Sequence, residues 1–298
     1  MSHTESLILE NEYLRAEVST QGAELCALLD KKHNFPVLKM RNDPFWDGVA
    51  PVLFPICGRL WEKTTYVNGT AYHMGTHGFA ADSTFTVKSH TKTAVALTLT
   101  DHDITRIALY PFRFLLTVEY ILDGASLLTR VTVENRDEQT LPFSIGFHPA
   151  FTLPFGEGGS VSDCYLDFPN ATETKIWELS PGALLTGNNL PYPLQNGKIL
   201  PITNDLLAEI DSIFFIGSGN TVTLASSSSD RRIRIDYDGF PYLGLWRPSD
   251  PNARFLCIEP WYGSPDTDRI STELSAKQDM ILLPPSASHS VSYRITAD

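Results

Sequence analysis

Four short segments of the sequence each place one charged or titratable side chain at the end of an apolar run. The side chains are Arg59, His77, His148 and Glu259, in the segments FPICGRLW, MGTHGFA, SIGFHPAF and LCIEPWYG. Burying a charge without a partner is costly, so polar groups in such settings need a reason. Histidine exchanges a proton near neutral pH, and apolar neighbours raise the pKa of a carboxyl group. These residue types therefore favour proton-transfer chemistry.

Each of these residues also has an ordinary structural interpretation. His148 would be a satisfied core histidine, Glu259 would form an ion pair with Arg59 or another arginine, and Arg59 would lie on the surface. Asp211, in AEIDSIFF, fits a helix end or a turn. The residues by themselves do not decide between these interpretations and a functional site.

His73 and His77 have the spacing of a metal-binding pair on a helix. Gly75 and Gly78 interrupt any helix there, because glycine is a poor helix former. The sequence also lacks a glycine-rich phosphate loop, G-x-S-x-G and H-E-x-x-H. We therefore expect no metal site.

The elements that would position these side chains are strands. Apolar and other residues alternate with a period of two, which is typical of half-buried strands, in residues 95–100, 112–120, 131–134, 232–237 and 288–296. Turn signals such as Asn68-Gly69 and Asp123-Gly124 separate the strands. Helical patterns are confined to residues 204–210 and 270–280. The pattern predicts one all-β unit over residues 1–298, with two large antiparallel sheets packed face to face.

The composition narrows the classes of partner. The chain has 298 residues, with 23 Lys and Arg against 35 Asp and Glu, and a formal net charge of −12. This balance argues against binding to nucleic acid or to an anionic membrane surface, although one arginine in a cleft can still bind a small anion. We see no signal peptide, no membrane-spanning stretch and no C-x-x-C pair. We therefore expect a cytoplasmic protein with reduced cysteines.

Five segments, in this order, resemble the aldose 1-epimerase (galactose mutarotase-like) family, and most closely its LacX-type branch. They are FPICGRL, MGTHGFA, GFHPAF, IDSIFF and LCIEPWYG. The resemblance extends over nearly the whole chain, from LENEYLRAEVSTQGAELCALLD to the final strand.

The resemblance implies a large antiparallel β-supersandwich with few short helices and a site in a cleft on its concave face. It implies interconversion of the α and β anomers of a free aldose, with no cofactor and no metal. Glu259 matches the family's general base and His148 its general acid. Arg59, His77 and Asp211 match the residues that bind the sugar. Neighbouring aromatic side chains would stack on the sugar ring, in a set of Trp61, Phe79, Phe147, Phe151, Trp246, Trp261 and Tyr262.

The chain departs from galactose mutarotases around both catalytic positions. Asparagines that flank the acid in the family are replaced, and Trp261 stands where a glutamine follows the base. Galactose specificity is therefore not implied. A hexose-6-phosphate mutarotase and a non-catalytic sugar-binding or sensing protein remain alternatives, and the resemblance leaves open whether the chain forms a homodimer.

Two distances would separate these alternatives. We expect catalysis if Glu259 and His148 face each other across a cleft about one pyranose wide, and binding only if the two side chains are far apart or pair with each other. A glycoside hydrolase would instead need Asp211 and Glu259 about 5–9.5 Å apart.

Overall fold

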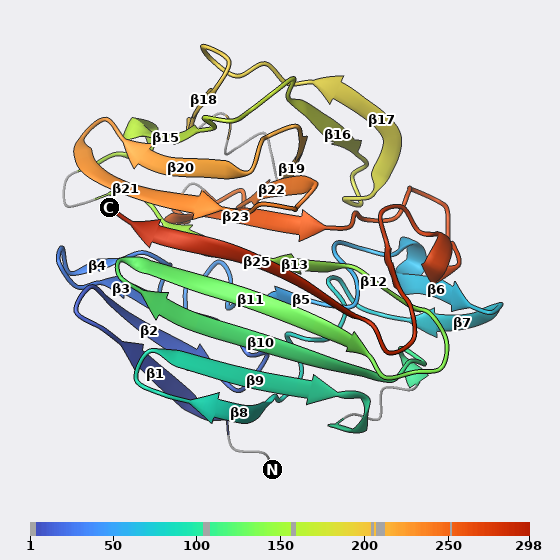
Figure 1. Cartoon of the computed structure of the whole chain (residues 1–298). Coiled ribbons are helices and arrows are strands. Elements are labelled where there is room, and N and C mark those ends of the chain that lie inside the picture. Colours follow the sequence, from blue (N-terminus) through green and yellow to red (C-terminus); the bar gives the residue numbers. More distant parts are fainter. Residues whose placement is uncertain (1–3, 104–107, 156–158, 204–205, 207–211, 251) are drawn as a thin grey trace.

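The structure of the chain, a computed structural model, describes residues 4–103, 108–155, 159–203, 206, 212–250 and 252–298. Two large sheets dominate it, and neighbouring strands in them run antiparallel. The nine-stranded sheet runs, in spatial order, through β18 (Ile199–Pro201), β15 (Cys164–Asp167), β20 (Thr221–Ser226), β21 (Ser229–Asp236), β25 (Ser288–Ala297), β11 (Ser126–Asn135), β10 (Phe114–Asp123), β9 (Ala94–Thr100) and β8 (Thr86–His90) (Figure 1).

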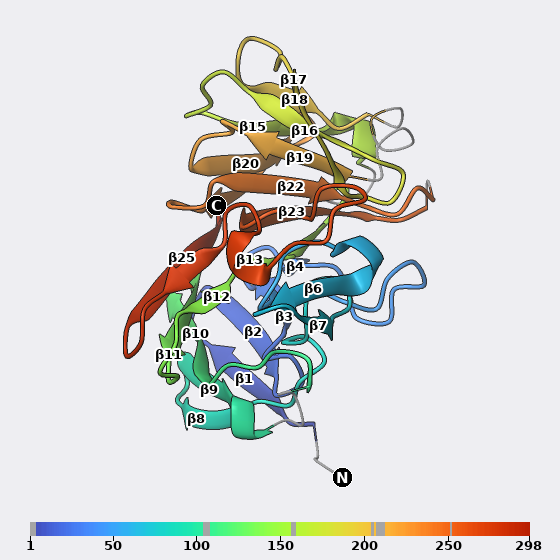
Figure 2. The same cartoon turned by 90° about the vertical axis from the view of Figure 1, so that its right-hand side faces the viewer.

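The eight-stranded sheet contains strands from several of the candidate site segments. It runs through β17 (Leu185–Pro191), β16 (Lys175–Leu179), β19 (Ser212–Ile216), β22 (Tyr242–Trp246), β23 (Phe255–Tyr262), β13 (Ile145–Phe147) and β5 (Val52–Leu53), with β14 (Ala150–Thr152) also paired to β23. Smaller sheets complete the molecule: β1 (Ser6–Glu10) to β2 (Leu14–Ser19), β3 (Leu25–Asp30) and β4 (Phe35–Pro36), then β6 (Thr64–Val67) with β7 (Thr70–His73), and β12 (Leu141–Phe143) with β24 (Ile281–Leu283). Figure 2 shows β1–β3 beside the layer of β8–β11.

The alternating sequence pattern explains the long strands. In β11 every second residue from Leu127 to Asn135 is buried, and its partner β10 precedes it across the predicted Asp123-Gly124 turn. Gly124 has a φ of +57°, in the left-handed region that favours glycine. The all-β class and the antiparallel sheets predicted from the sequence are confirmed.

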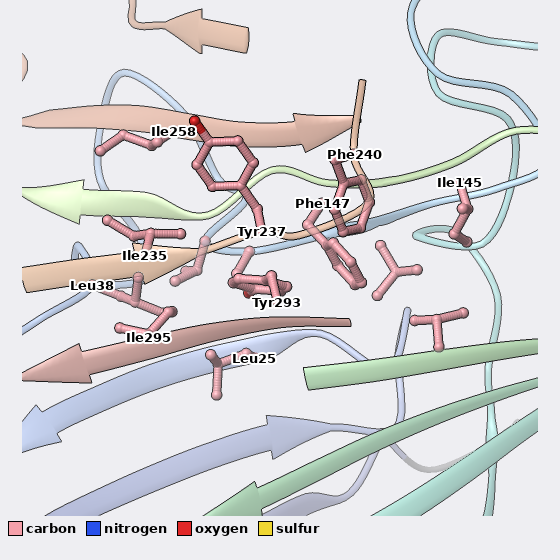
Figure 3. Close-up of a cluster of buried hydrophobic side chains, with 14 of the residues drawn as sticks. Leu25, Leu38, Ile145, Phe147, Ile235, Tyr237, Phe240, Ile258, Tyr293 and Ile295 are labelled. Carbon is pink, nitrogen blue, oxygen red and sulfur yellow. The ribbon is translucent and has the colours of Figure 1, made fainter. Parts of the chain in front are cut away.

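The core fills the space between the sheets. Leu25 of β3, Phe147 of β13, Ile235 of β21 and Tyr293 of β25 belong to one buried cluster (Figure 3). The rings of Phe147 and Tyr293 have centroids 4.4 Å apart, so the strand next to the site is anchored directly on the nine-stranded sheet. The same cluster contains residues from Leu7 to Ile295. The single unit over residues 1–298 stays a prediction.

The helical predictions fare less well. Residues 270–280 contain only the three-residue 3₁₀ turn η5 (Leu274–Ala276), so the predicted helix is wrong there. Most of the segment 204–210 lies outside the described residues. The other described 3₁₀ turns are η1 (Trp61–Lys63), η2 (Asp101–Asp103) and η4 (Val161–Asp163). Within the described part of the chain, no helix has the length and hydropathy needed to cross a bilayer.

Substitution of Leu116, which is 0% exposed in β10, should be costly. We expect Leu116→Ala to lower the free energy of unfolding by about 2–5 kcal/mol, because it removes buried methyl groups and leaves a cavity. Leu190→Ala is the matched control, since Leu190 is 45% exposed, and it should change stability by less than about 0.5 kcal/mol. Urea unfolding of both variants measures the difference, and equal effects would contradict this account of the core.

Candidate active site

Strand register places His148 and Glu259 opposite each other. β23 pairs with β13 through Gly146 and Trp261, and with β14 through Ala150 and Cys257. Both pairs have the same register. His148 is midway between Gly146 and Ala150, and Glu259 is midway between Cys257 and Trp261. His148 therefore lies across from Glu259. The His148 Nε2 and Glu259 Oε2 atoms are 3.2 Å apart.

The strand on the other side of Glu259 leaves room for its carboxylate. Gly244 of β22 is the cross-strand partner of Glu259. A Cβ atom at this glycine would lie 3.2 Å from the Glu259 Cβ, a contact tighter than side chains normally make. A larger residue at position 244 would therefore crowd the Glu259 side chain.

His77 approaches the pair from a tight loop. Its backbone NH donates to the Gly58 carbonyl over 2.8 Å, and its Nδ1 accepts from the Gly58 NH over 3.1 Å. Acceptance at Nδ1 assigns the ring proton to Nε2, so His77 is a donor on its free side. The ring lies 5.4 Å from the His148 ring and 5.3 Å from Trp261 between centroids. By contrast, the Nδ1 of His73 lies 3.0 Å from the Thr64 hydroxyl in the β6–β7 hairpin, so the two histidines have different partners.

Arg59 lines the cleft without contacting Glu259. The exposed guanidinium donates to the Gly182 carbonyl over 2.9 Å, so it bridges to the loop between β16 and β17. The Arg59–Glu259 ion pair considered from the sequence is therefore not formed, and His148 takes that place.

A buried ion pair that the sequence did not reveal supports the loop that carries Arg59. The Asp266 NH donates to the Arg59 carbonyl over 2.9 Å, and an Asp266 carboxylate oxygen accepts from the Trp61 NH over 3.0 Å. The other oxygen lies 3.3 Å from the Lys277 ammonium, and both side chains are 2% exposed. The residues come from distant parts of the chain, and no local pattern marks their pairing.

Asp211 lies outside the described residues. Its neighbour Ser212 begins β19 and lines the cleft, together with Phe214 of the same strand. The role of Asp211 remains a prediction, and so does its separation from Glu259.

A row of rings crosses the cleft. Adjacent members have centroids 4.8–5.4 Å apart, from Phe214 through Trp261, His77 and His148 to Trp46. Of the aromatic residues predicted to stack on a sugar, Trp246 and Trp261 line the cleft. Phe79, Phe147 and Phe151 instead belong to the core, and Trp61 and Tyr262 do not line the cleft. The sequence did not identify Trp46 and Phe214 as cleft residues. Trp46 lies in a loop rich in proline and aspartate, and Phe214 belongs to a strand that is apolar on both faces.

Burial controls the charges of the pair. Both side chains are nearly inaccessible, with 9% of His148 and 2% of Glu259 exposed. Burial lowers the pKa of His148 well below 6.5, with a smaller contribution from the nearby His77. Burial also raises the pKa of Glu259 well above 4.5, against a smaller lowering by the Trp261 indole. The two effects favour an uncharged pair that holds one exchangeable proton.

The shifted pKa of His148 predicts its titration. A histidine in a model peptide has a pKa of about 6.5, whereas the buried His148 ring should stay neutral as the pH falls through that value. NMR titration of the ring signals measures this, with His148→Gln to assign them. His77, whose pKa burial and the charge of Arg59 lower to about 4, should also stay neutral at pH 6. A His148 signal that titrates near pH 6.5 would contradict the buried pair.

Comparison with known proteins agrees with this geometry. The family model described as aldose 1-epimerase matches residues 5–296. The chain is 31% identical to the chromosomal protein LacX of Lactococcus lactis subsp. lactis, over 97% of this chain and 98% of that protein. A galactose mutarotase related enzyme from Lactobacillus acidophilus superimposes with a TM-score of 0.90 at 30% identity, over 99% of this chain and 97% of that one. A galactose mutarotase-like protein from Lactobacillus casei gives a TM-score of 0.92 at 30% identity, over 99% and 100%. The chain therefore belongs to the aldose 1-epimerase family, and within it to the LacX-type branch.

Proposed function

We propose that this protein is a cytoplasmic mutarotase that interconverts the α and β anomers of a free hexose by opening and closing the sugar ring. The observation that carries the proposal is the 3.2 Å contact between His148 and Glu259 on the cleft floor. The cleft has a volume of about 830 Å³, within the range of small-molecule sites. Arg59 and His77 line it as well.

The contact between His148 and Glu259 requires us to correct the expectation, drawn from the sequence, about the distance between them. That expectation assigned binding only to a protein whose Glu259 and His148 pair with each other. However, the anomeric hydroxyl and the ring oxygen are bonded to the same carbon, C1. An acid and a base that serve both oxygens can lie close together and need not have a whole pyranose between them. The direct contact is therefore compatible with catalysis.

The reaction needs only proton movements. Glu259 as base removes the proton of the anomeric hydroxyl while His148 as acid protonates the ring oxygen. The C1–O bond of the ring then breaks, rotation about C1–C2 turns the aldehyde, and the reverse transfers close the ring. The uncharged pair reaches the required state when its proton passes from Glu259 to His148 across their contact. No atom of the sugar is lost, and the pair regains its initial protonation on closure.

Donors around the pair would hold the sugar. The Nε2–H of His77 would donate to a ring hydroxyl, and Arg59 would bind hydroxyls or stabilise negative charge that develops on oxygen. Asp211 would accept hydrogen bonds from other hydroxyls, as the family resemblance implies.

The charges at the cleft rim favour a free sugar over a sugar phosphate. Among the described lining residues, Arg41 lies 3.2 Å from the Glu24 carboxylate, and the guanidinium of Arg59 already bonds a carbonyl. Asp47 and Asp82 add two further carboxylates. A phosphate dianion would meet more negative than positive charge there.

Substitution of either member of the pair should slow the exchange of anomers. We expect Glu259→Gln and His148→Asn each to lower kcat by about 10²–10⁴-fold, since each removes one proton-transfer group. NMR exchange measurements or polarimetry on glucose and galactose record the rate, and calorimetry records sugar binding. Glu134→Gln, at a half-buried glutamate of β11 in the other large sheet, is the matched control.

Two outcomes would contradict this mechanism. Equal rates for wild type and Glu259→Gln would remove the base from it. Sugar binding without any acceleration by the wild type would favour the non-catalytic sugar-binding alternative.

Phosphorylated sugars should be the poorer substrates. We expect kcat/KM for glucose to exceed that for glucose 6-phosphate by roughly tenfold or more, because like charges at a binding site are unfavourable. Asp82→Asn should narrow this ratio, whereas Asp238→Asn, in an exposed turn, is the control. A ratio below one would favour the hexose-6-phosphate alternative.

A further inference from the structure

A third side chain joins the acid–base pair. Cys257 lies two residues before Glu259 on β23, so both side chains leave the strand on the same face. One donor atom from each of His148, Cys257 and Glu259 lies within 4.8 Å of the other two, and all three residues are buried. The mechanism above uses no thiol at this position, so the cluster calls for its own explanation.

The donor atoms lack internal partners. Apart from its contact with His148, Glu259 Oε2 has no hydrogen-bond partner among the described residues, although it is buried. The Nδ1 of His148 also lacks one in that part of the chain, and Cys257 is a free cysteine. Buried polar atoms are normally satisfied. A metal ion that enters from the cleft would replace the proton between His148 Nε2 and Glu259 Oε2 and bind the electron pairs of both atoms.

The donors match the preferences of zinc. Imidazole nitrogen, thiolate sulfur and carboxylate oxygen are its ordinary ligands, and open zinc sites use three protein ligands with the fourth position free. Zinc bonds of about 2.0–2.1 Å to nitrogen and oxygen place two tetrahedral donors about 3.3 Å apart. The observed separation of His148 Nε2 and Glu259 Oε2 is 3.2 Å. His148 and Glu259 line the cleft, which would supply the fourth position.

One nearby cation opposes such binding. The Lys39 ammonium lies 5.2 Å from the Phe255 ring centroid, beside Cys257, and donates to the Trp46 carbonyl over 2.7 Å. Its charge disfavours a second cation, but it also lowers the pKa of the Cys257 thiol, against the larger raising effect of burial. Binding therefore requires release to solvent of the thiol proton and of the proton that His148 and Glu259 hold between them, and affinity should increase with pH.

We propose that His148, Cys257 and Glu259 form a site for Zn²⁺ or another borderline divalent metal ion, and that the bound ion inhibits the enzyme. The ion would occupy the electron pairs that the acid and base need for proton transfer. Metal binding itself does not depend on the proposed function, whereas inhibition does.

Cobalt provides a probe that does not rely on activity. We expect Co²⁺ titrated into the wild-type protein to produce thiolate-to-cobalt charge-transfer absorption, which Zn²⁺ then abolishes by displacement. Cys257→Ala and Cys257→Ser should lose this absorption, and Glu259→Gln should weaken metal affinity by about 10–100-fold or more, since even residues that only support a ligand contribute that much. Cys164→Ala is the matched control, because Cys164 is equally buried but lies on β15 of the other large sheet. Circular dichroism of each variant confirms that it is folded.

The outcomes are distinct. Absence of the absorption in the wild type, or its persistence in the folded Cys257 variants, would overturn the metal site. If zinc slows anomer exchange in the wild type and much less in Cys257→Ser, inhibition through this site is supported. If the wild type shows no anomer exchange with any sugar, the proposed function fails, while the cobalt spectrum still decides the site.

Discussion

The candidate site depends on the register of β23 against the β13–β14 segment. Side chains in a strand alternate between faces, so a slip of one residue would turn either His148 or Glu259 away from the cleft. The Phe147–Tyr293 ring contact anchors one side of this register in the core. The pairing of Gly244 with Glu259 holds the opposite side of β23 against β22. The pairing of β13 and β14 with β23 thus holds His148 and Glu259, which are distant in sequence, next to each other.

The surroundings of the His148–Glu259 pair support the proposed proton transfer. In water an imidazole and a carboxyl group would each have its ordinary pKa and would be solvated separately. In the apolar floor of the cleft, burial moves the two pKa values in opposite directions and favours the state without charge. In that state the proton lies on Glu259, and a polar substrate that stabilises the charged arrangement would help to move it to His148.

The sequence predicted the parts of the site that depend on local pattern. The alternating runs identified the strands, and the family resemblance identified Arg59, His77, His148 and Glu259, which line one cleft. The sequence did not predict contacts that join separate segments of the chain. The Asp266–Lys277 ion pair, the Arg59–Gly182 contact and the position of Trp46 each depend on how separate loops meet. The helix predicted at 270–280 failed because local propensity is weak against tertiary packing.

Paired strands form the floor of the cleft, and loops form much of its rim. Glu259 lies in β23 and His148 lies between β13 and β14, which both pair with β23, whereas Arg41, Asn42 and Asp47 come from the loop between β4 and β5, and Ala183 comes from the loop between β16 and β17. Loops accept substitutions and insertions that a strand register does not. Under the proposed function, mutations in these two loops would change which sugar is accepted and leave His148 and Glu259 in place. Specificity would then evolve separately from the proton-transfer pair.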